Sequence, residues 1–558
     1  MTSDLPEKTA AGAEPPLRTL AARVMALSPE EAETAILDNP RATALVRALA
    51  PQDFRILVRE IGPEDAVELL SLASNDQWRH ILDVEAWQRD ELSMARVEYW
   101  LDILRQADAA RLGRWLAREE PELFKLWLFR TTQITALEED EDPTNLPGDW
   151  FSLDGTLYLK VPEPEGPVDR EALMRAVLDR VAEEDFELCR NLLFEASGVI
   201  PAETEEELFR LRNVRLAELG FSPFQEAVEI YAPISPERLP EAVRGMAPGQ
   251  DEDAAPILPG EVRGASLFSE ALSGLGGAPV HLELESEFAG LLNRVISADQ
   301  ITVESREDLA AVVRKVSGFL SMGLARIAGG RRDLAAAAIL RRPLSALFRL
   351  GYSAVLAVSA KAVSWRRNAW FTRAGLPLEF WGEMRLGHVG GLLLKKPLAF
   401  DNYVSGRLHR EFESLADVTR AEEALSSVTA LDDLFAALDP GAAWLSIPGI
   451  AWDSLLLTPW ARHLLGLSPE AVPLSAQELR RFFEELWEPS ARLPFAVSFS
   501  AKESFLSFLT VASGWDAALL RDRLGRDLDA LFTELEDEYG AVAIRDISPP
   551  LVRHVLAA

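Results

Sequence analysis

The sequence has 558 residues, of which 48% are apolar and 26% are charged. These are the proportions of ordinary globular proteins, so they exclude a mostly disordered or collagen-like chain, and the length allows roughly two to four domains. With 57 Lys and Arg against 89 Asp and Glu, the net charge is −32, which argues against nucleic acid or anionic lipid as the partner of the whole surface. The single cysteine, Cys189, excludes an intramolecular disulfide and a structural zinc site built from several cysteines.

The N-terminal residues and the longest uncharged stretch indicate where in the cell the protein is expected to be. Residues 1–16 lack the apolar core of a secretory signal and are expected to form a flexible tail. The longest stretch without a charged residue, Pro440 to Trp452, has 13 residues and contains two prolines and two glycines. A membrane helix needs about 20 apolar residues. We therefore predict a soluble, cytoplasmic protein with no membrane partner.

Residues 17–137 are expected to form a domain of helical repeats. Apolar side chains recur there at intervals of three and four residues, which is typical of amphipathic helices. A short phrase of a small residue, usually a proline, and then acids recurs at intervals of 22, twelve and twelve residues, and it suits the first turn of a helix. The phrase occurs at Leu27–Glu31, Leu49–Asp53, Ile61–Asp65 and Ala73–Asp76. Two such units make a helical hairpin, so the pattern predicts an α-solenoid-like stack.

The stretch from Leu49 to Leu70, LAPQDFRILVREIGPEDAVELL, resembles the N-terminal superhelical domain of MgtE-type magnesium transporters. The resemblance covers about residues 20–130 and implies a superhelical arrangement of short helices. It does not reach the regulatory domains or the membrane helices of those transporters, so it does not imply magnesium transport.

Residues 138–167 are predicted to be an acidic, proline-rich linker. The run Glu138–Asp142 is followed by several prolines and glycines, which interrupt regular structure. Carboxylates suit Mg²⁺ or Ca²⁺, but five consecutive acids cannot all converge on one ion, and EF-hand spacing is missing. We therefore predict a solvated linker and no metal site. Within it, Thr156–Val161 could form a strand.

Residues 168–232 are predicted to be a small helical region with a distinctive motif, RLRNVRLAELGFSPFQEAVEIY, at 210–231. Gly220 is expected to end one helix, and Ser222-Pro223 to begin the next. The motif resembles the signature of a bacterial family of unknown function, and Leu344–Tyr352 is also similar to that family, so the resemblance is expected to span most of the chain. It implies no activity. The polar residues of the motif could form a site or tie adjacent helices together: Arg212, Asn213, Arg215 and Tyr231.

Residues 233–264 read as a second linker, rich in proline and glycine, and residues 265–558 as a C-terminal helical domain. Phe495–Ser500 has a short strand-like alternation, and prolines are expected to separate the later helices: Pro448, Pro459, Pro473, Pro489 and Pro494. The predicted fold class is predominantly all-α, with N-terminal α-solenoid-like repeats followed by a larger helical domain.

The charge is unevenly distributed. Residues 311–410, the basic window, hold 17 Lys and Arg and four acids, a net charge of +13, whereas the rest of the chain holds 40 basic and 85 acidic residues and carries −45. Aromatic residues lie among the basic ones, which suits stacking on bases and pairing with phosphates. The candidate anion-binding residues are Arg331, Arg332, Arg341, Arg342, Arg366, Arg367, Lys395 and Lys396.

Three interpretations of the basic window stay open. The window could bind an anionic partner, it could dock on the acidic surface of its own chain, or its arginines could lie on solvated faces with the aromatics in the core. Apolar runs such as Ala335–Leu340 indicate core helices with basic ends rather than a continuous basic stripe.

Sequence motifs for catalysis are missing. The six histidines form no zinc motif, and neither a Walker A sequence nor a Gly-x-Ser-x-Gly elbow occurs. One candidate is the glycine-rich segment around His388, Gly387 to Gly391, beside Lys395-Lys396, where a loop could contact phosphate. We predict no catalytic residue, no metal and no cofactor, and Cys189 is expected to be a buried apolar residue.

These observations lead to a functional hypothesis. We expect a non-enzymatic scaffold or adaptor that presents helical-repeat surfaces to a protein partner. The first alternative is a regulatory module that binds an anionic ligand or nucleic acid through the basic window, with nucleic acid possible but not favoured. The second is an enzyme of unrecognised type.

Overall fold

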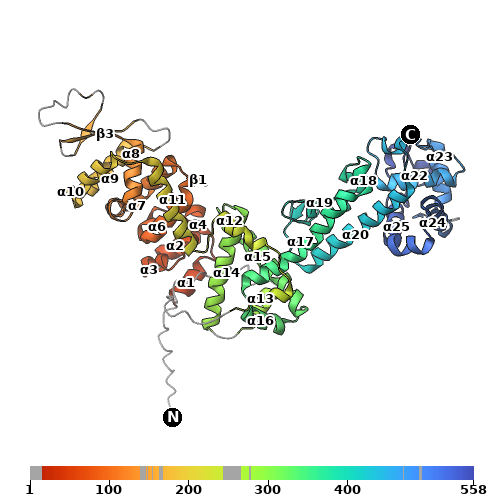
Figure 1. Cartoon of the computed structure of the whole chain (residues 1–558), viewed down its shortest axis with the longest axis horizontal. Coiled ribbons are helices and arrows are strands. Elements are labelled where there is room, and N and C mark those ends of the chain that lie inside the picture. The colour runs from red at the N-terminus through yellow and green to blue at the C-terminus, as the bar shows by residue number, and fades with distance from the viewer. Residues whose placement is uncertain are drawn as a thin grey trace, which may run out of the picture. The chain divides into compact units, whose positions relative to one another are not determined.

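The computed structural model describes residues 16–88, 90–137, 146, 149–153, 155–162, 168–242, 266–275, 278–468, 470–488 and 493–558. Within these residues the chain forms 25 α-helices, a few 3-10 turns and several short strands (Figure 1). The prediction of a predominantly all-α fold is therefore confirmed. The chain divides into two compact units. The first contains Met1–Ala232, Arg238–Leu320 and Ile327–Phe348, and the second contains Pro233–Glu237, Ser321–Arg326 and Arg349–Ala558. The domain boundaries expected from the sequence stay a prediction.

The first unit begins with short helices, and three of the four repeated phrases start one. Helices begin at Pro29, Pro51 and Asn75, and the last of these has a capping box in which the Ser74 hydroxyl accepts from the Gln77 N–H. The helices are α1 (Leu17–Val24), α2 (Pro29–Leu37), α3 (Ala42–Arg47), α4 (Pro51–Ile61), α5 (Val67–Leu72), α6 (Asn75–Glu85), α7 (Met94–Arg118) and α8 (Pro121–Thr131).

The phrase at Pro63 does not start a helix, so the expectation of a regular twelve-residue repeat is wrong there. Gly62 adopts φ +108°, outside the helical region, and the backbone turns so that the N–H groups of Asp65 and Ala66 donate to the Gly62 carbonyl. Helix α5 therefore begins four residues after Pro63, at Val67. A left-handed glycine at a helix end outweighs the preference of proline for a helix start.

The core of the first unit is built around indoles. Trp78 of α6, Trp100 and Trp115 of α7, and Trp127 of α8 are all buried. Trp78 and Trp115 meet edge to face with ring centroids 5.9 Å apart, a favourable aromatic arrangement. The apolar periodicity predicts each of these helices, but it does not predict which of them pack against each other.

Short antiparallel strands lie beside these helices. They are β1 (Trp87–Gln88), β2 (Glu91–Leu92), β3 (Gln133–Ala136), β4 (Phe151–Ser152) and β5 (Leu157–Lys160). The last three form one sheet in the order β3-β5-β4, with Leu159 opposite both Ile134 and Phe151. The strand expected at Thr156–Val161 is therefore confirmed as β5. The acidic run Glu138–Asp142, most of the predicted tail at 1–16 and most of the second linker lie outside the described residues.

The rest of the first unit is also helical. Its helices are α9 (Arg170–Glu184), α10 (Phe186–Ala196), α11 (Pro201–Glu218), α12 (Phe224–Ala227), α13 (Leu267–Ser273), α14 (Ala278–Asp299), part of α15 (Arg306–Ala328), α16 (Arg332–Arg341) and the first turn of α17 (Leu344–Asn368). As expected, α11 ends just before Gly220, which has φ +87°. Helix α12 begins at Phe224 with Pro223 at the N-cap, one residue later than the expected start at Ser222-Pro223.

The second unit holds the rest of α17 and the C-terminal helices. These are α18 (Trp370–Arg373), α19 (Glu383–Leu392), α20 (Leu415–Leu438), α21 (Ala442–Leu445), α22 (Trp452–Leu464), α23 (Ala476–Leu486), α24 (Phe499–Ser513) and α25 (Ala517–Tyr539), with a hairpin of β6 (Ala399–Phe400) and β7 (His409–Arg410). Two expectations fail here. Pro459 lies inside α22 rather than between helices, and Phe495–Ser500 forms only one isolated bridge, Val497 with Trp487, before α24 begins.

Within the described residues, one helix is long and apolar enough to cross a membrane. This is α17, and half of its most apolar window is buried inside the protein. A core helix of a soluble protein has the same length and composition, so a single such helix is weak support for a span. The cytoplasmic location stays a prediction.

Candidate functional site

The eight candidate anion-binding residues do not belong to one unit. Arg331, Arg332, Arg341 and Arg342 lie in the first unit, and Arg366, Arg367, Lys395 and Lys396 lie in the second. The first four flank the ten-residue helix α16, so the two pairs are separated by about 15 Å along its axis. Neither half of the set forms a continuous basic stripe along one element.

Three of the arginines in the first unit are used to hold their own chain together. Arg332 donates from Nε to the Glu270 carbonyl at 2.7 Å, at the end of α13. Arg342 donates to the Leu239 carbonyl at 2.7 Å and to the Pro240 carbonyl at 3.1 Å. Arg331 forms an exposed ion pair with Asp333 at 2.7 Å. The chain therefore satisfies these cations mainly with backbone carbonyls, which no charge count could reveal.

Most aromatic residues of the basic window belong to the core, and Tyr403, which is 61% exposed, is an exception. In the second unit, Trp370 stacks on Phe435 with ring centroids 5.2 Å apart, and Trp365 stacks on Phe371 at 5.1 Å. Trp381 is buried between Phe371 and Phe435. None of these three indoles is exposed, so they are not available to stack on bases. Arg366 and Arg367 are exposed beside this core, at the C-terminus of α17.

The glycine-rich segment around His388 is a helix rather than a loop, which corrects the expectation of a phosphate-binding loop. Gly387 and Gly391 both lie in α19. A Cβ at Gly387 would come within 2.3 Å of the Phe400 ring, and one at Gly391 within 2.3 Å of the Leu398 carbonyl oxygen. The glycines therefore let α19 approach the β6–β7 hairpin closely, and tertiary packing overrides their low helix propensity.

His388 itself is half-buried and lies edge to face with the Phe400 ring, at 5.0 Å. Burial lowers the pKa of His388, and the nearby positive charges of Arg420 and His409 lower it further. His409 shares a hydrogen bond with the Gly387 carbonyl at 2.9 Å. Two histidines thus line the contact between α19 and the hairpin.

Two buried aspartates organise the polar contacts of the chain, one in each unit. In the first unit, Asp83 of α6 accepts two hydrogen bonds from Arg215 of α11, at 2.6 and 2.8 Å. Arg212 donates from Nε to the Asp83 carbonyl at 2.5 Å. The motif arginines therefore tie α11 to α6, which favours the interpretation of the motif as a set of helix ties. Tyr231 has a similar role, since its hydroxyl donates to Asp299, which also pairs with the buried Lys315.

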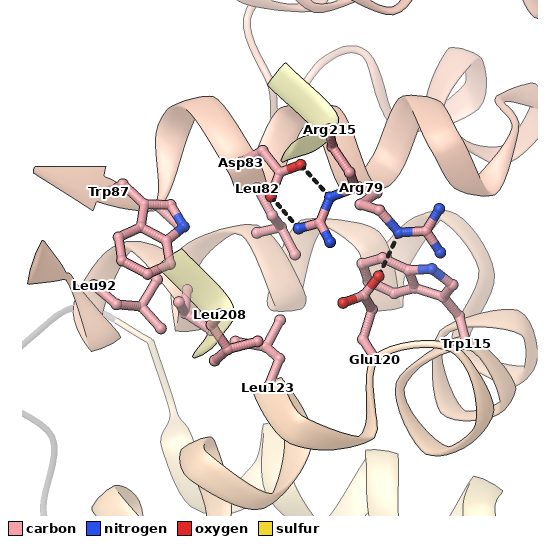
Figure 2. A pocket seen from close by; sticks show the side chains of 12 residues that line it. Arg79, Leu82, Asp83, Trp87, Leu92, Trp115, Glu120, Leu123, Leu208 and Arg215 are labelled. Atoms are coloured by element: carbon pink, nitrogen blue, oxygen red, sulfur yellow. Dashed lines mark hydrogen bonds and ion pairs between the residues drawn. The ribbon is translucent and has the colours of Figure 1, made fainter. Parts of the chain in front are cut away.

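A small cavity lies beside Asp83 (Figure 2). Arg215 faces Asp83 on one side and Arg79 faces Glu120 on the other. The cavity measures about 20 Å³, which is room for one water molecule and too little for a substrate. The indole N–H of Trp115 borders it, is buried, and has no hydrogen-bond partner among the described residues. The arrangement therefore suits a structural water rather than catalysis.

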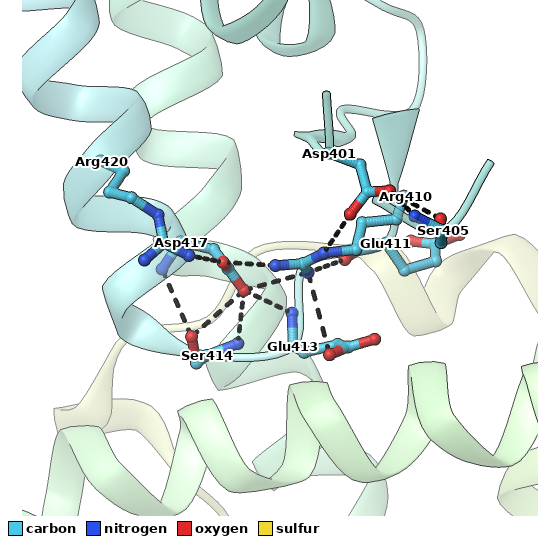
Figure 3. A network of polar contacts seen from close by, with 8 residues as sticks. All are labelled: Asp401, Ser405, Arg410, Glu411, Glu413, Ser414, Asp417 and Arg420. Atoms are coloured by element: carbon cyan, nitrogen blue, oxygen red, sulfur yellow. Dashed lines mark hydrogen bonds and ion pairs between the residues drawn. The ribbon is translucent and has the colours of Figure 1, made fainter. Parts of the chain in front are cut away.

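In the second unit, Asp417 and Asp401 hold Arg410 between them (Figure 3). The guanidinium donates to Asp417 at 2.7 and 3.2 Å, and its Nε lies 3.2 Å from Asp401. Asp417 also accepts from Arg420, from the backbone N–H of Glu413 and from that of Ser414. Burial alone would raise the pKa of Asp417, but these hydrogen bonds hold it below its usual value.

Sequence reasoning missed the acidic partners of these arginines. In so acidic a chain, no count distinguishes Asp83 from other aspartates. Asp417 did carry a signal, because Ser414-x-x-Asp417 before an apolar run has the spacing of a capping box. Among the described residues, no group of three or more His, Cys, Asp or Glu side chains could hold a metal ion. Cys189 is buried, as expected.

Large apolar side chains are exposed on three neighbouring elements of the first unit. Phe194 of α10 is 72% exposed and Ile200, just before α11, is 56% exposed. Helix α8 contacts both helices, through the ion pairs Lys125–Glu195 and Arg130–Glu205. We call the following set the phenylalanine edge: Phe129, Phe186, Phe194 and Ile200.

Comparison of the chain with curated proteins and with solved structures finds no match in either set. A sequence profile of the family of unknown function DUF6178 matches residues 9–558. Because this match covers nearly the whole chain, both units lie within a single family region. The protein belongs to the family of unknown function DUF6178.

Proposed function

We propose that this protein is a scaffold or adaptor that binds a protein partner through the phenylalanine edge. The observation that carries the proposal is the 72% exposure of Phe194 on α10, together with the exposed apolar side chains on α8 and at the start of α11, helices that contact each other. A phenylalanine can bury about 150–250 Å² of surface, and soluble monomers rarely leave contiguous apolar patches in water unless a partner covers them.

The charges around the edge define the chemistry of the partner. Exposed acids flank the apolar side chains on α10 and α11: Glu187, Glu195, Glu203, Glu206 and Glu207. Three of them already form ion pairs within the first unit, Glu187 with Arg190, Glu195 with Lys125 and Glu207 with Arg210, so Glu203 and Glu206 carry most of the charge that a partner would meet. Complementary charge accelerates association and selects partners. The partner is therefore a protein segment that offers apolar anchors bordered by lysine or arginine.

The N-terminal resemblance supports the same function. Stacked short helices offer extended surfaces for protein binding, and the superhelical domain of MgtE-type transporters, which residues 20–130 resemble, is such a stack. The proposal also includes three features that the sequence predicts: the α-solenoid-like repeat architecture, the family signature at residues 210–231, and a cytoplasmic location.

The test compares Phe194→Asp with a matched control, Phe499→Asp. Phe499 is 73% exposed on α24 of the second unit, so both substitutions remove the same exposed side chain and add the same charge. Tagged wild-type and variant chains are isolated from the native cells, and the bound proteins are quantified by mass spectrometry. We expect one specific protein with wild type and with the control, reduced at least tenfold with Phe194→Asp, and equal thermal stability in all three.

Equal recovery of every bound protein with Phe194→Asp and with wild type would contradict the proposal. Recovery of a partner that carries no basic residues at its contact surface would contradict the chemistry assigned to it.

The alternative function, binding of an anionic ligand or nucleic acid, rests on two exposed arginines. Within the described residues, the side chains of Arg366 and Arg367 form no hydrogen bond or ion pair. If they contact phosphates, affinity for RNA falls with rising salt, and replacing both with alanine makes that dependence shallower. Absence of RNA and DNA binding at low salt would contradict this alternative.

A further inference from the structure

We propose that the tip of the β6–β7 hairpin, residues 402–407, is a second docking site that binds an acidic surface of a protein partner. It lies in the second unit and is independent of the phenylalanine edge. Its contact side chains are Tyr403, Val404 and Arg407. A chain with two separate docking sites of opposite charge preference can bring two proteins together, so the inference goes beyond the function proposed above.

The backbone of the tip is set in an unusual conformation. Asn402 and Tyr403 have φ values of +49° and +62°, and the Val404 N–H donates to the Asp401 carbonyl at 3.1 Å. Asparagine often adopts this left-handed region at hairpin turns, but an aromatic residue such as Tyr403 rarely does. The turn is closed by hydrogen bonds from the Tyr403 N–H to the Arg407 carbonyl at 3.1 Å and from the Gly406 N–H to the Tyr403 carbonyl at 2.9 Å. Such conformations persist where the surroundings impose them, and they are enriched at functional sites.

The surroundings that impose this conformation are the contacts of Asp401. Its carboxylate accepts from the backbone N–H and from the hydroxyl of Ser405, each at 2.7 Å. Arg410 holds the same aspartate and reaches across to the buried Asp417 of α20 (Figure 3). The tip is thus ordered before it meets a partner, which reduces the entropy cost of binding.

The side chains presented by this ordered turn are those of a binding site. Val404 is 88% exposed, the most of any large apolar residue in the described part of the chain, and Tyr403 is 61% exposed. Arg407 is exposed as well. Tyrosine and arginine are enriched among the residues that contribute most to protein interfaces. Nothing in the fold of the hairpin requires these side chains to be apolar or large, because they contact solvent.

Charge identifies the partner. Residues 402–410 contain Arg407 and Arg410 and no acid, and Arg410 is already paired with aspartates. The Arg407 guanidinium forms no hydrogen bond or ion pair within the described residues, so it is available to a carboxylate. A fluid bilayer gains nothing from a fixed backbone, whereas a shaped protein surface does, because a preordered turn lowers the entropy cost of binding. A protein surface with an apolar pocket bordered by Asp or Glu fits best.

The experiment places a photo-crosslinking amino acid, p-benzoylphenylalanine, at position 403 of the full chain in the native cells, with the same residue at exposed position 499 as the control. The protein cross-linked from 403 and not from 499 is identified and purified. Its affinity for the wild-type chain is then measured by isothermal titration calorimetry. We expect Tyr403→Ala to weaken binding at least tenfold, Arg407→Glu to weaken it further and to remove its salt dependence, and Phe499→Ala to change nothing.

Each contrary outcome overturns the proposal. These outcomes are no cross-link above the control, a cross-linked partner without acidic residues at the contact, a cross-link to a second copy of the chain, or binding to vesicles of anionic lipid that Tyr403→Ala abolishes. The phenylalanine edge is tested separately, because Phe194→Asp leaves the hairpin tip intact and Tyr403→Ala leaves the edge intact.

Discussion

Asp83 and Asp417 are both buried aspartates held by arginines, but they connect different parts of the molecule. Asp83 is tied to Arg215, 132 residues away in the sequence, so its contact joins two helices of the first unit. Asp417 is tied to Arg410, seven residues away, and to backbone N–H groups at the start of its own helix. An aspartate–arginine pair thus joins two distant helices in the first unit, and another such pair supports a local hairpin in the second.

The largest effect is expected from breaking the long-range tie. Arg215→Ala leaves the Asp83 carboxylate buried without its partner, and removing one member of a buried ion pair costs about 3–5 kcal/mol. We expect urea unfolding, followed by circular dichroism, to show a loss of about 3 kcal/mol. The control is Arg210→Ala on the same helix, an exposed pair with Glu207, which should change stability by less than about 0.5 kcal/mol. Equal effects of the two variants would show that Asp83 is not an energetic tie.

A smaller effect is expected from displacing the hairpin of the second unit. Gly391→Ala places a Cβ 2.3 Å from the Leu398 carbonyl oxygen, and such overpacking costs about 1–3 kcal/mol. Gly390→Ala, one residue away, meets nothing closer than 3.9 Å and should gain up to about 1 kcal/mol from helix propensity. The same unfolding measurement checks both, and destabilisation by both alanines would contradict the packing role of Gly391.

Asp417→Asn tests the local support directly. The substitution removes a charge that accepts several hydrogen bonds, and we expect a loss of about 1.5–3 kcal/mol at neutral pH. The folded-state pKa of Asp417 lies below its ordinary value of 3.8, so the carboxylate contributes stability above that pH and loses it as the pH falls through the folded pKa. The difference in unfolding free energy between wild type and variant should therefore be constant from neutral pH to about pH 4 and should shrink below that pH. A gap that shrinks already near neutral pH would contradict this assignment.

A pH-dependent effect, which is absent at neutral pH, is expected from the first unit. Burial lowers the pKa of His80, near Asp83, from 6.5 to about 3, and the charges of Arg55 and Arg212 contribute. Below pH 6.5 the unfolded chain binds a proton that the folded chain does not, so the stability contribution of His80 is complete above that pH and falls by up to about 1.4 kcal/mol per pH unit below it. Burial raises the pKa of Asp53 to about 6, which acts in the opposite direction.

The contribution of His80 is therefore measured as a difference between wild type and His80→Gln. We expect wild type to lose stability relative to the variant between about pH 6.5 and pH 4, where Asp417 still contributes fully. Parallel pH profiles for the two chains would show that His80 is not a buried neutral group.

Much of the fold could be predicted from local patterns. Helix starts at Pro29, Pro51 and Asn75 follow from proline and serine caps, and β5 follows from its alternating apolar residues. These features depend on a few neighbouring residues, and local chemistry decides them. At Pro63 the conformation of the neighbouring Gly62 outweighs the preference of proline, and in the His388 segment contacts with the hairpin outweigh the low helix propensity of glycine. The position of Pro459 inside α22 has no such explanation in the structure.

The candidate sites were less predictable. The charge count located the basic window, but it could not show that Arg332 and Arg342 donate to backbone carbonyls or that Trp381 is buried. Exposure of Phe194 and Val404 is likewise invisible in the sequence, because neither residue differs in type from the apolar residues that fill the core.

By itself, the sequence determined the helical class, the starts of a few N-terminal helices and the unequal distribution of charge, because these depend on composition and on residues close along the chain. Only the tertiary structure decided which arginines meet Asp83 and Asp417, why Gly391 must lack a side chain, and which apolar residues reach solvent. The contact of Asp83 depends on residues far apart in the sequence, whereas those of Asp417 and Gly391 depend on how a nearby segment folds back. One chain has too many acids and apolar residues for spacing alone to select the pairs.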